Sequence, residues 1–206
     1  MFERLAEFVT NIIETIGYPG LTLLVALENV FPPIPSEVIL PLAGFMTGQG
    51  RFSFVLVVLA TTLGSLIGAL VLYGIGAAIG KRRVGALVAH HGHWALLTPE
   101  DLAKAEQWFD RYGPIAVFVG RLVPIVRSLV SIPAGYQRMP LLQFIALTFF
   151  GSMIWNGTLV TLGWVFGDNW HVIEDYVGWL QYAVIALVAI LVIRFVWTRL
   201  RARRLA

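Results

Sequence analysis

The chain has 206 residues, of which 58% are hydrophobic and only 13% are charged, and its formal net charge is +3. Soluble domains carry about 25% charged residues, so this composition argues against a water-soluble domain. The small net charge gives no reason to expect a nucleic acid partner. The absence of cysteine excludes disulfides, thiolate catalysis and zinc–thiolate sites.

Three stretches without Asp, Glu, Lys or Arg have the length of membrane spans. Residues 52–80 and 139–167 each contain 29 such positions, and residues 176–193 contain 18. A transmembrane helix needs roughly 20 apolar residues. We therefore predict an all-α integral membrane protein that crosses the bilayer several times, with residues 1–206 forming a single membrane domain.

The N-terminal residues 2–16 carry apolar side chains at spacings of three and four, with charged residues between them. This pattern predicts an amphipathic helix. A helix of this kind, placed before the first apolar stretch, is expected to lie on the membrane surface.

Residues 18–50 are apolar but interrupted. Pro32, Pro33 and Pro35 lie between two short apolar arms, and prolines in close succession stop a helix. Ser36 can cap the second arm, which carries Glu37 in its first turn and extends to about residue 48. Two short arms around a break predict a re-entrant helical hairpin.

The first long span is predicted over residues 54–79, and the basic run Lys81, Arg82 and Arg83 marks its cytoplasmic end. We assign residues 18–80 to a first repeat. Residues 81–112 are predicted to form a cytoplasmic linker with a surface helix, because Thr98 and Pro99 have the order expected at a helix N-terminus.

The second half follows the same plan over residues 113–167. A short apolar arm is followed by a break around Pro124, a second arm to about Gln137 and a second span over residues 141–166. An acidic loop, residues 168–175, is expected outside the cell. The C-terminal span 176–198 then leads to a basic tail, which places the C-terminus in the cytoplasm.

Glycine spacing supports a repeat. Gly64, Gly76 and Gly80 are each followed by a glycine 87 residues later, and Gly44 is followed by Gly135 after 91 residues. The predicted loop locations give the two spans opposite directions. The predicted architecture is therefore an inverted repeat of a re-entrant hairpin plus a transmembrane helix, as in many secondary transporters.

Four charged residues lie beside the predicted breaks: Glu28, Glu37, Arg121 and Arg127. A charge at bilayer depth costs roughly 2.5–3.5 kcal/mol, so these side chains must pair or reach water. Hairpins that meet tip to tip would bring the acids opposite the arginines. The four residues either form structural ion pairs or line a pathway, in which arginine forks bind phosphate and buried carboxyl groups exchange protons.

Two segments carry a family resemblance. Residues 120–127 (GRLVPIVR), followed by Gly135 and Met139, resemble the signature of the DedA membrane-protein family, and residues 28–37 (ENVFPPIPSE) are similar to its first motif. The resemblance covers roughly residues 18–190.

The resemblance implies a bacterial inner-membrane protein with opposed re-entrant hairpins. It also implies a role in recycling undecaprenyl phosphate, dependence on the proton gradient, and, from eukaryotic relatives, phospholipid scrambling. The matching positions would make Glu28, Glu37, Arg121 and Arg127 the substrate-binding or coupling residues. The motif positions expected to have a structural role are Pro35, Pro124, Gly44 and Gly135. Many members carry an acid where this chain has Ala69, which puts a proton step at that position in doubt.

The hypothesis we favour is a transporter or flippase of a phosphate-bearing lipid, with protons as a candidate partner and a homo-oligomer as an open alternative. A lipid phosphatase is less favoured, because the four histidines lie in polar segments away from the arginines. His90, His91 and His93 lack partners spaced for a metal site, so we expect no metal, no cofactor and no catalytic residue. A scramblase, an ion exchanger and an envelope homeostasis or assembly factor stay open as alternatives.

Overall fold

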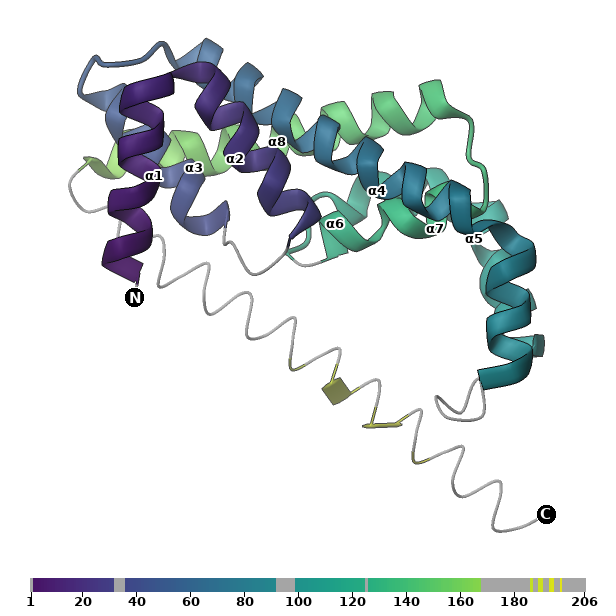
Figure 1. The fold of residues 1–206 in the computed structure, drawn as a ribbon. Helices are drawn as coiled ribbons and strands as arrows, with labels where there is room; N and C mark the ends of the chain where they lie inside the picture. Colours follow the sequence, from purple (N-terminus) through teal and green to yellow (C-terminus); the bar gives the residue numbers. More distant parts are fainter. Residues whose placement is uncertain are drawn as a thin grey trace.

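The computed structural model describes residues 2–31, 36–91, 99–124 and 126–167, together with isolated positions between 186 and 197. Every regular element in these ranges is a helix (Figure 1). In chain order the helices are α1 (Phe2–Ile16), α2 (Tyr18–Val30), α3 (Ser36–Gly48), α4 (Phe54–His91), α5 (Pro99–Gly120), α6 (Val126–Leu129), α7 (Ser131–Tyr136) and α8 (Leu141–Phe166).

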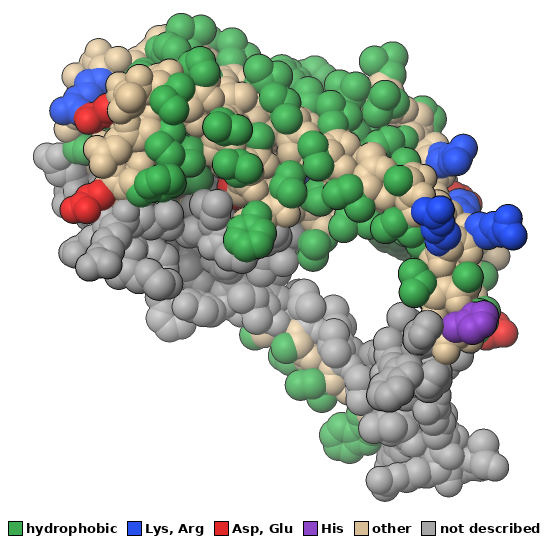
Figure 2. Space-filling model, in the orientation of Figure 1, with side chains coloured by type: hydrophobic (Ala, Val, Ile, Leu, Met, Phe, Trp, Pro, Cys, Tyr) green, Lys and Arg blue, Asp and Glu red, His purple; other side chains and the backbone are tan. Residues whose placement is uncertain are grey.

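Two helices are long and apolar enough to cross a membrane, over residues 54–90 in α4 and 141–166 in α8. One stripe of α4 leaves an apolar side chain exposed at every fourth position, from Val55 to Ile75. Hydrophobic side chains cover much of the face seen in Figure 2, and the charged ones gather at its two ends. Water would oppose so large an apolar surface, whereas lipid would cover it.

The two halves of the chain are packed into each other. Helix α2 packs along α4, α3 along α8 and α7 along α4, while α4 and α8 also contact each other. The second arm of each half therefore lies against the long helix of the other half. This exchange of partners brings the ends of α2 and α6 together between the two long helices.

Glycines make the close packing possible. A Cβ atom built on Gly44 would lie 2.1 Å from the Val160 carbonyl oxygen, and one built on Gly163 would lie 2.0 Å from that of Pro41. In the other half, Gly135 and Gly76 make the same kind of approach between α7 and α4, with distances of 2.1 and 2.3 Å to carbonyl oxygens. Any side chain at these positions would force the helices apart.

Both long helices reach a glycine with positive φ, 69° at Gly80 and 52° at Gly167, and these glycines are 87 residues apart. Gly167 ends α8. At Gly80 the chain bends, but a helical segment continues to His91 (Figure 1). The predicted end of the first span thus coincides with the bend, whereas the helical segment that follows it was not predicted.

Helix α5 also differs from the prediction. A surface helix ending near Tyr112 and a separate arm were expected, whereas one helix continues through Pro114 to Gly120. Its buried positions, Phe109, Gly113, Val117 and Gly120, form one stripe that continues past the proline. Continuous packing offsets the hydrogen bond that the proline cannot make.

Some of the remaining predicted elements form in the structure, and the others lie outside the described residues. The N-terminal helix forms as α1, which buries Val9 and Ile13, and the second arm of the second hairpin forms as α6 and α7, separated by Val130. The proline break with Pro35 and the acidic loop 168–175 lie outside the described residues. So does nearly all of the C-terminal span and its basic tail.

Substitution of Gly76 by alanine should destabilise the protein, because the new methyl group would overlap the Ile132 carbonyl oxygen, 2.3 Å away. Overpacking of this kind costs about 1–3 kcal/mol. At Gly74, two residues earlier in α4, a Cβ atom would meet nothing within 4 Å. Gly74→Ala is therefore the matched control. Thermal unfolding of both variants in the same lipid nanodisc tests the packing, and equal midpoints would contradict it.

Candidate functional site

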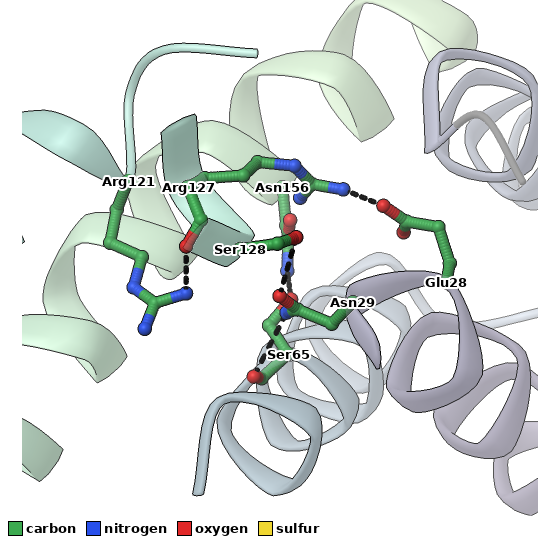
Figure 3. A network of polar contacts seen from close by, with 7 residues as sticks. All are labelled: Glu28, Asn29, Ser65, Arg121, Arg127, Ser128 and Asn156. Atoms are coloured by element: carbon green, nitrogen blue, oxygen red, sulfur yellow. Dashed lines mark hydrogen bonds and ion pairs between the residues drawn. The ribbon is translucent and has the colours of Figure 1, made fainter. Parts of the chain in front are cut away.

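Buried polar side chains meet where α2 and α6 end between the long helices (Figure 3). Glu28 and Asn29 belong to the last turn of α2, and Arg127 and Ser128 belong to α6. Ser65 of α4 and Asn156 of α8 come from the two long helices, and Arg121 directly follows α5. We call these seven residues the polar cluster.

The ion pair between Glu28 and Arg127 joins the two halves of the chain. Arg127 Nη2 donates to Glu28 Oε1, and the two residues are separated by 99 positions in the sequence. They are only 4% and 5% exposed, respectively. When two charges are this deeply buried, each is stable only because the other neutralises it, since the desolvation of a lone charge costs much free energy.

Arg121 is even more deeply buried, with 1% exposure, and it contacts no acid among the described side chains. Its Nη1 donates to the backbone oxygen of Arg127 (Figure 3). Its Nη2 donates to Ser131 Oγ at 2.8 Å and to Thr148 Oγ1 at 3.3 Å. Arg121 therefore orients the backbone that carries Arg127.

The expectation that the acids face the arginines holds for Glu28 and Arg127. The side chain of Glu37 lies outside the described residues, so its partner stays a prediction. Its backbone forms the start of α3.

A chain of uncharged polar groups connects the halves beside the ion pair. Ser128 Oγ donates to Asn29 Oδ1 at 3.0 Å, and Asn29 Nδ2 donates to the Ser65 carbonyl oxygen at 3.0 Å. Asn156 Nδ2 donates to Ser65 Oγ at 3.1 Å. Asn29, Ser65 and Ser128 were not among the predicted site residues. A polar side chain within an apolar stretch was the signal that could have identified them.

The polar cluster has hydrogen-bonding capacity left over. Glu28 Oε2, Arg121 Nε and Asn156 Oδ1 are buried and have no hydrogen-bond partner within the described part of the protein. An unpaired buried polar atom costs about 1–3 kcal/mol. One donor and two acceptors are thus in place for a polar or anionic guest or for a proton.

Three of the four predicted motif positions, Pro124, Gly44 and Gly135, belong to the described residues. Pro124 is buried in the turn between α5 and α6, and its carbonyl oxygen accepts a hydrogen bond from Val126. Gly44 and Gly135 lie at the helix contacts described above. Ala69 is fully buried in an apolar group that includes Ala134 and Phe144, so no titratable side chain stands at that point. Among the described residues no group of three or more potential metal ligands occurs.

Comparison with known proteins identifies a protein family whose sequence model this chain matches. Residues 34–165 match the sequence model of the VTT domain. The chain is 40% identical over 188 residues to a protein of Lactococcus lactis subsp. cremoris (strain MG1363) named "Alkaline phosphatase-like protein", covering 91% of this chain and 88% of the relative. It is 34% identical over 201 residues to "Undecaprenyl phosphate transporter A" of Staphylococcus aureus (strain NCTC 8325 / PS 47), covering 96% and 99%.

A protein of Bacillus subtilis (strain 168), also named "Undecaprenyl phosphate transporter A", is 30% identical over 192 residues, covering 93% of this chain and 91% of the relative. No solved structure matches the chain significantly. These matches extend over almost the whole chain, so the matched region spans the positions of the polar cluster.

Removal of one member of the buried ion pair should destabilise the fold by about 3–5 kcal/mol, because the other charge is left unpaired. We expect this loss for Arg127→Met, and partial recovery in the double variant Glu28→Gln/Arg127→Met. The exposed pair of Arg51 and Glu14 provides the control, since Glu14→Gln should cost no more than about 1 kcal/mol. Denaturant unfolding in detergent gives the free energy of unfolding of the wild type and the three variants. Equal losses of stability for the buried and exposed pairs would refute the assignment of Glu28 and Arg127 as a buried ion pair.

Proposed function

Because the chain belongs to the VTT domain family, also known as DedA, we propose that it is a membrane transporter of a phosphate-bearing lipid, most directly undecaprenyl phosphate. Relatives from two genera that match nearly the full chain are named as transporters of that lipid. In this proposal the protein returns the lipid across the bacterial inner membrane and acts as a flippase without changing the lipid covalently.

The observation that carries the proposal is the burial of two arginines where helices converge, Arg127 paired with Glu28 and Arg121 bonded to the Arg127 backbone. An arginine fork matches the geometry of a phosphate and can replace one oxyanion by another. The Glu28 carboxylate holds the place that a phosphate would take. A lipid headgroup in the polar cluster would compete with Glu28 for Arg127 and could use the free Nε of Arg121.

The two hairpins, α2–α3 and α5–α7, are proposed to be re-entrant and to form an inverted repeat. The equivalent glycine contacts, Gly44 with α8 and Gly135 with α4, support this proposal. Alternating access would then be a rocking of one half against the other around the polar cluster. The contacts between Asn29 and Ser128 and between Glu28 and Arg127 cross the dividing line. They would open and re-form in each cycle.

Proton coupling follows from the same ion pair. Protonation of Glu28 would abolish its negative charge and release Arg127 to bind the phosphate, whereas deprotonation would restore the pair and expel the anion. Protons and phosphate would therefore enter from the same side, in the direction of the proton gradient. Glu37 is proposed as a second acid of the pathway. Ala69 cannot take part in a proton step.

The orientation we propose places Lys81, Arg82 and Arg83 and the basic C-terminal tail in the cytoplasm, following the excess of positive charge. The three basic residues are exposed directly after the bend in α4. This orientation puts the bend at the inner membrane surface. The homo-oligomer considered above is not required by the transport proposal.

Reconstitution in proteoliposomes tests the function. We expect the protein to move a fluorescent polyprenyl phosphate across the bilayer, with a rate that rises with an imposed pH gradient. Arg127→Lys should lower the rate at least tenfold, because lysine keeps the charge but cannot form the two-pronged contact. Arg51→Lys, at an exposed ion pair, should leave it unchanged.

Three other results would each replace the proposal. Equal movement of a fluorescent phospholipid would identify a scramblase. Release of inorganic phosphate from the lipid would identify a hydrolase. No movement of either lipid by protein with a normal unfolding midpoint would favour an ion exchanger or an envelope homeostasis factor.

A further inference from the structure

An apolar groove of about 800 Å³ runs along the outer face of α5 and is closed on its other side by α6 and α7. We call it the α5 groove. Sites for small organic ligands have volumes of about 300–1,000 Å³, so the α5 groove can hold a segment of a long chain. Among the described residues that line it, Tyr112 and Trp108 are the two with a polar side-chain atom.

The shape of the α5 groove comes from a change in side-chain size along α5. The small residues Ala116 and Gly120 line the groove four residues apart, and the larger Ile115 and Val119 line it beside them in the sequence. Leu129 and Pro133 belong to the opposite wall. Ile115, Val119 and Leu129 are 62%, 48% and 49% exposed, so the groove is open along its length to whatever surrounds the protein.

Basic residues neighbour the groove lining at both ends. At the inner end, the lining residues Gly120 and Val126 directly precede Arg121 and Arg127 in the sequence, and both arginine side chains are buried in the polar cluster. At the outer end, the Arg111 guanidinium lies 5.3 Å from the ring centre of Tyr112.

The outer end is also close to the bend of α4. Lys81 Nζ lies 4.0 Å from Asp110 Oδ1. Asp110 is within one helical turn of the lining residues Trp108 and Tyr112. The exposed basic side chains at that bend are visible in Figure 2. An apolar groove with basic residues next to its lining is complementary to an amphiphile that joins a hydrocarbon chain to an anion.

We propose that the α5 groove binds the hydrocarbon chain of the transported lipid, in the segment next to its phosphate. The proposal rests on the proposed function and extends it to the chain-binding part of the same site. The phosphate leaves Arg121 and Arg127 toward Arg111 and the basic bend, at the cytoplasmic side, while the chain stays in the groove.

The groove is expected to position the lipid more than to increase the affinity for its hydrocarbon chain. A chain that moves from bilayer to groove leaves one apolar environment for another, so the hydrophobic effect contributes little. Packing against Val119 and Leu129 instead limits where the phosphate can lie. The expected role is therefore to keep the headgroup in register with the polar cluster.

Photolabelling tests this assignment without requiring transport. The probe is a polyprenyl phosphate with a diazirine on the chain near the phosphate, bound to the full-length protein in phosphatidylcholine nanodiscs. We expect labels to concentrate in peptides that cover residues 108–133. Unlabelled undecaprenyl phosphate should compete with the probe, whereas excess phosphatidylcholine should not.

Two matched pairs of variants make the result specific. Val119→Trp fills the groove at a valine that is 48% exposed. Val71→Trp, its control, changes a valine on α4 that is 47% exposed. Leu129→Trp and Leu63→Trp, 49% and 51% exposed, form the second pair. We expect each groove variant to lower labelling of the 108–133 peptides at least fivefold and each α4 variant to leave it unchanged, with unfolding midpoints measured for all four.

Equal labelling within both pairs would overturn the groove assignment even if transport occurs. A photoreactive residue at position 119 that cross-links to residues 176–193 instead of the probe would also overturn it, because the chain's own last apolar segment would then fill the groove. Loss of labelling in both groove variants, together with absent lipid movement by the wild type, would retain the groove and reject the transport proposal.

Discussion

The arrangement of this protein depends on one constraint, the placement of opposite charges deep among apolar helices. Glu28 at the end of α2 and Arg127 on α6 are each nearly inaccessible and bonded to each other across 99 positions of sequence. Each charge would be prohibitively costly alone. The pair therefore requires that the two halves of the chain meet at this point, and Arg121 holds the backbone of Arg127 in the position that the pair needs.

Glycine contacts make that meeting sterically possible. The approach of α3 to α8 at Gly44 and Gly163, and of α7 to α4 at Gly135 and Gly76, brings backbones closer than any side chain would allow. Gly151 acts more directly, since a Cβ atom there would lie 2.8 Å from Arg121 Cβ. The glycines therefore both allow the helices to pack closely and leave room for the buried arginine.

The polar cluster combines stability with unused bonding capacity. A purely structural ion pair would be expected to have every polar atom satisfied, yet Glu28 Oε2, Arg121 Nε and Asn156 Oδ1 have no partner within the described structure. Unpaired donors and acceptors of this kind are what the proposed exchange of partners requires. In the same proposal, the α5 groove keeps the chain of an amphiphile in an apolar environment while its charged end reaches the cluster.

The sequence by itself determined the helical class, the two long apolar helices and the charged residues at the breaks, because charge-free length, proline position and glycine spacing are local properties. It misjudged the end of the helix at Tyr112, since the buried stripe that continues past Pro114 forms only when α5 packs against α4, α6, α7 and α8. Only the tertiary structure decided that Glu28 pairs with Arg127, that Arg121 bonds to a backbone oxygen, and that Asn29, Ser65 and Ser128 join them. These contacts connect helices that are far apart in sequence, and their partners are set by how the helices cross.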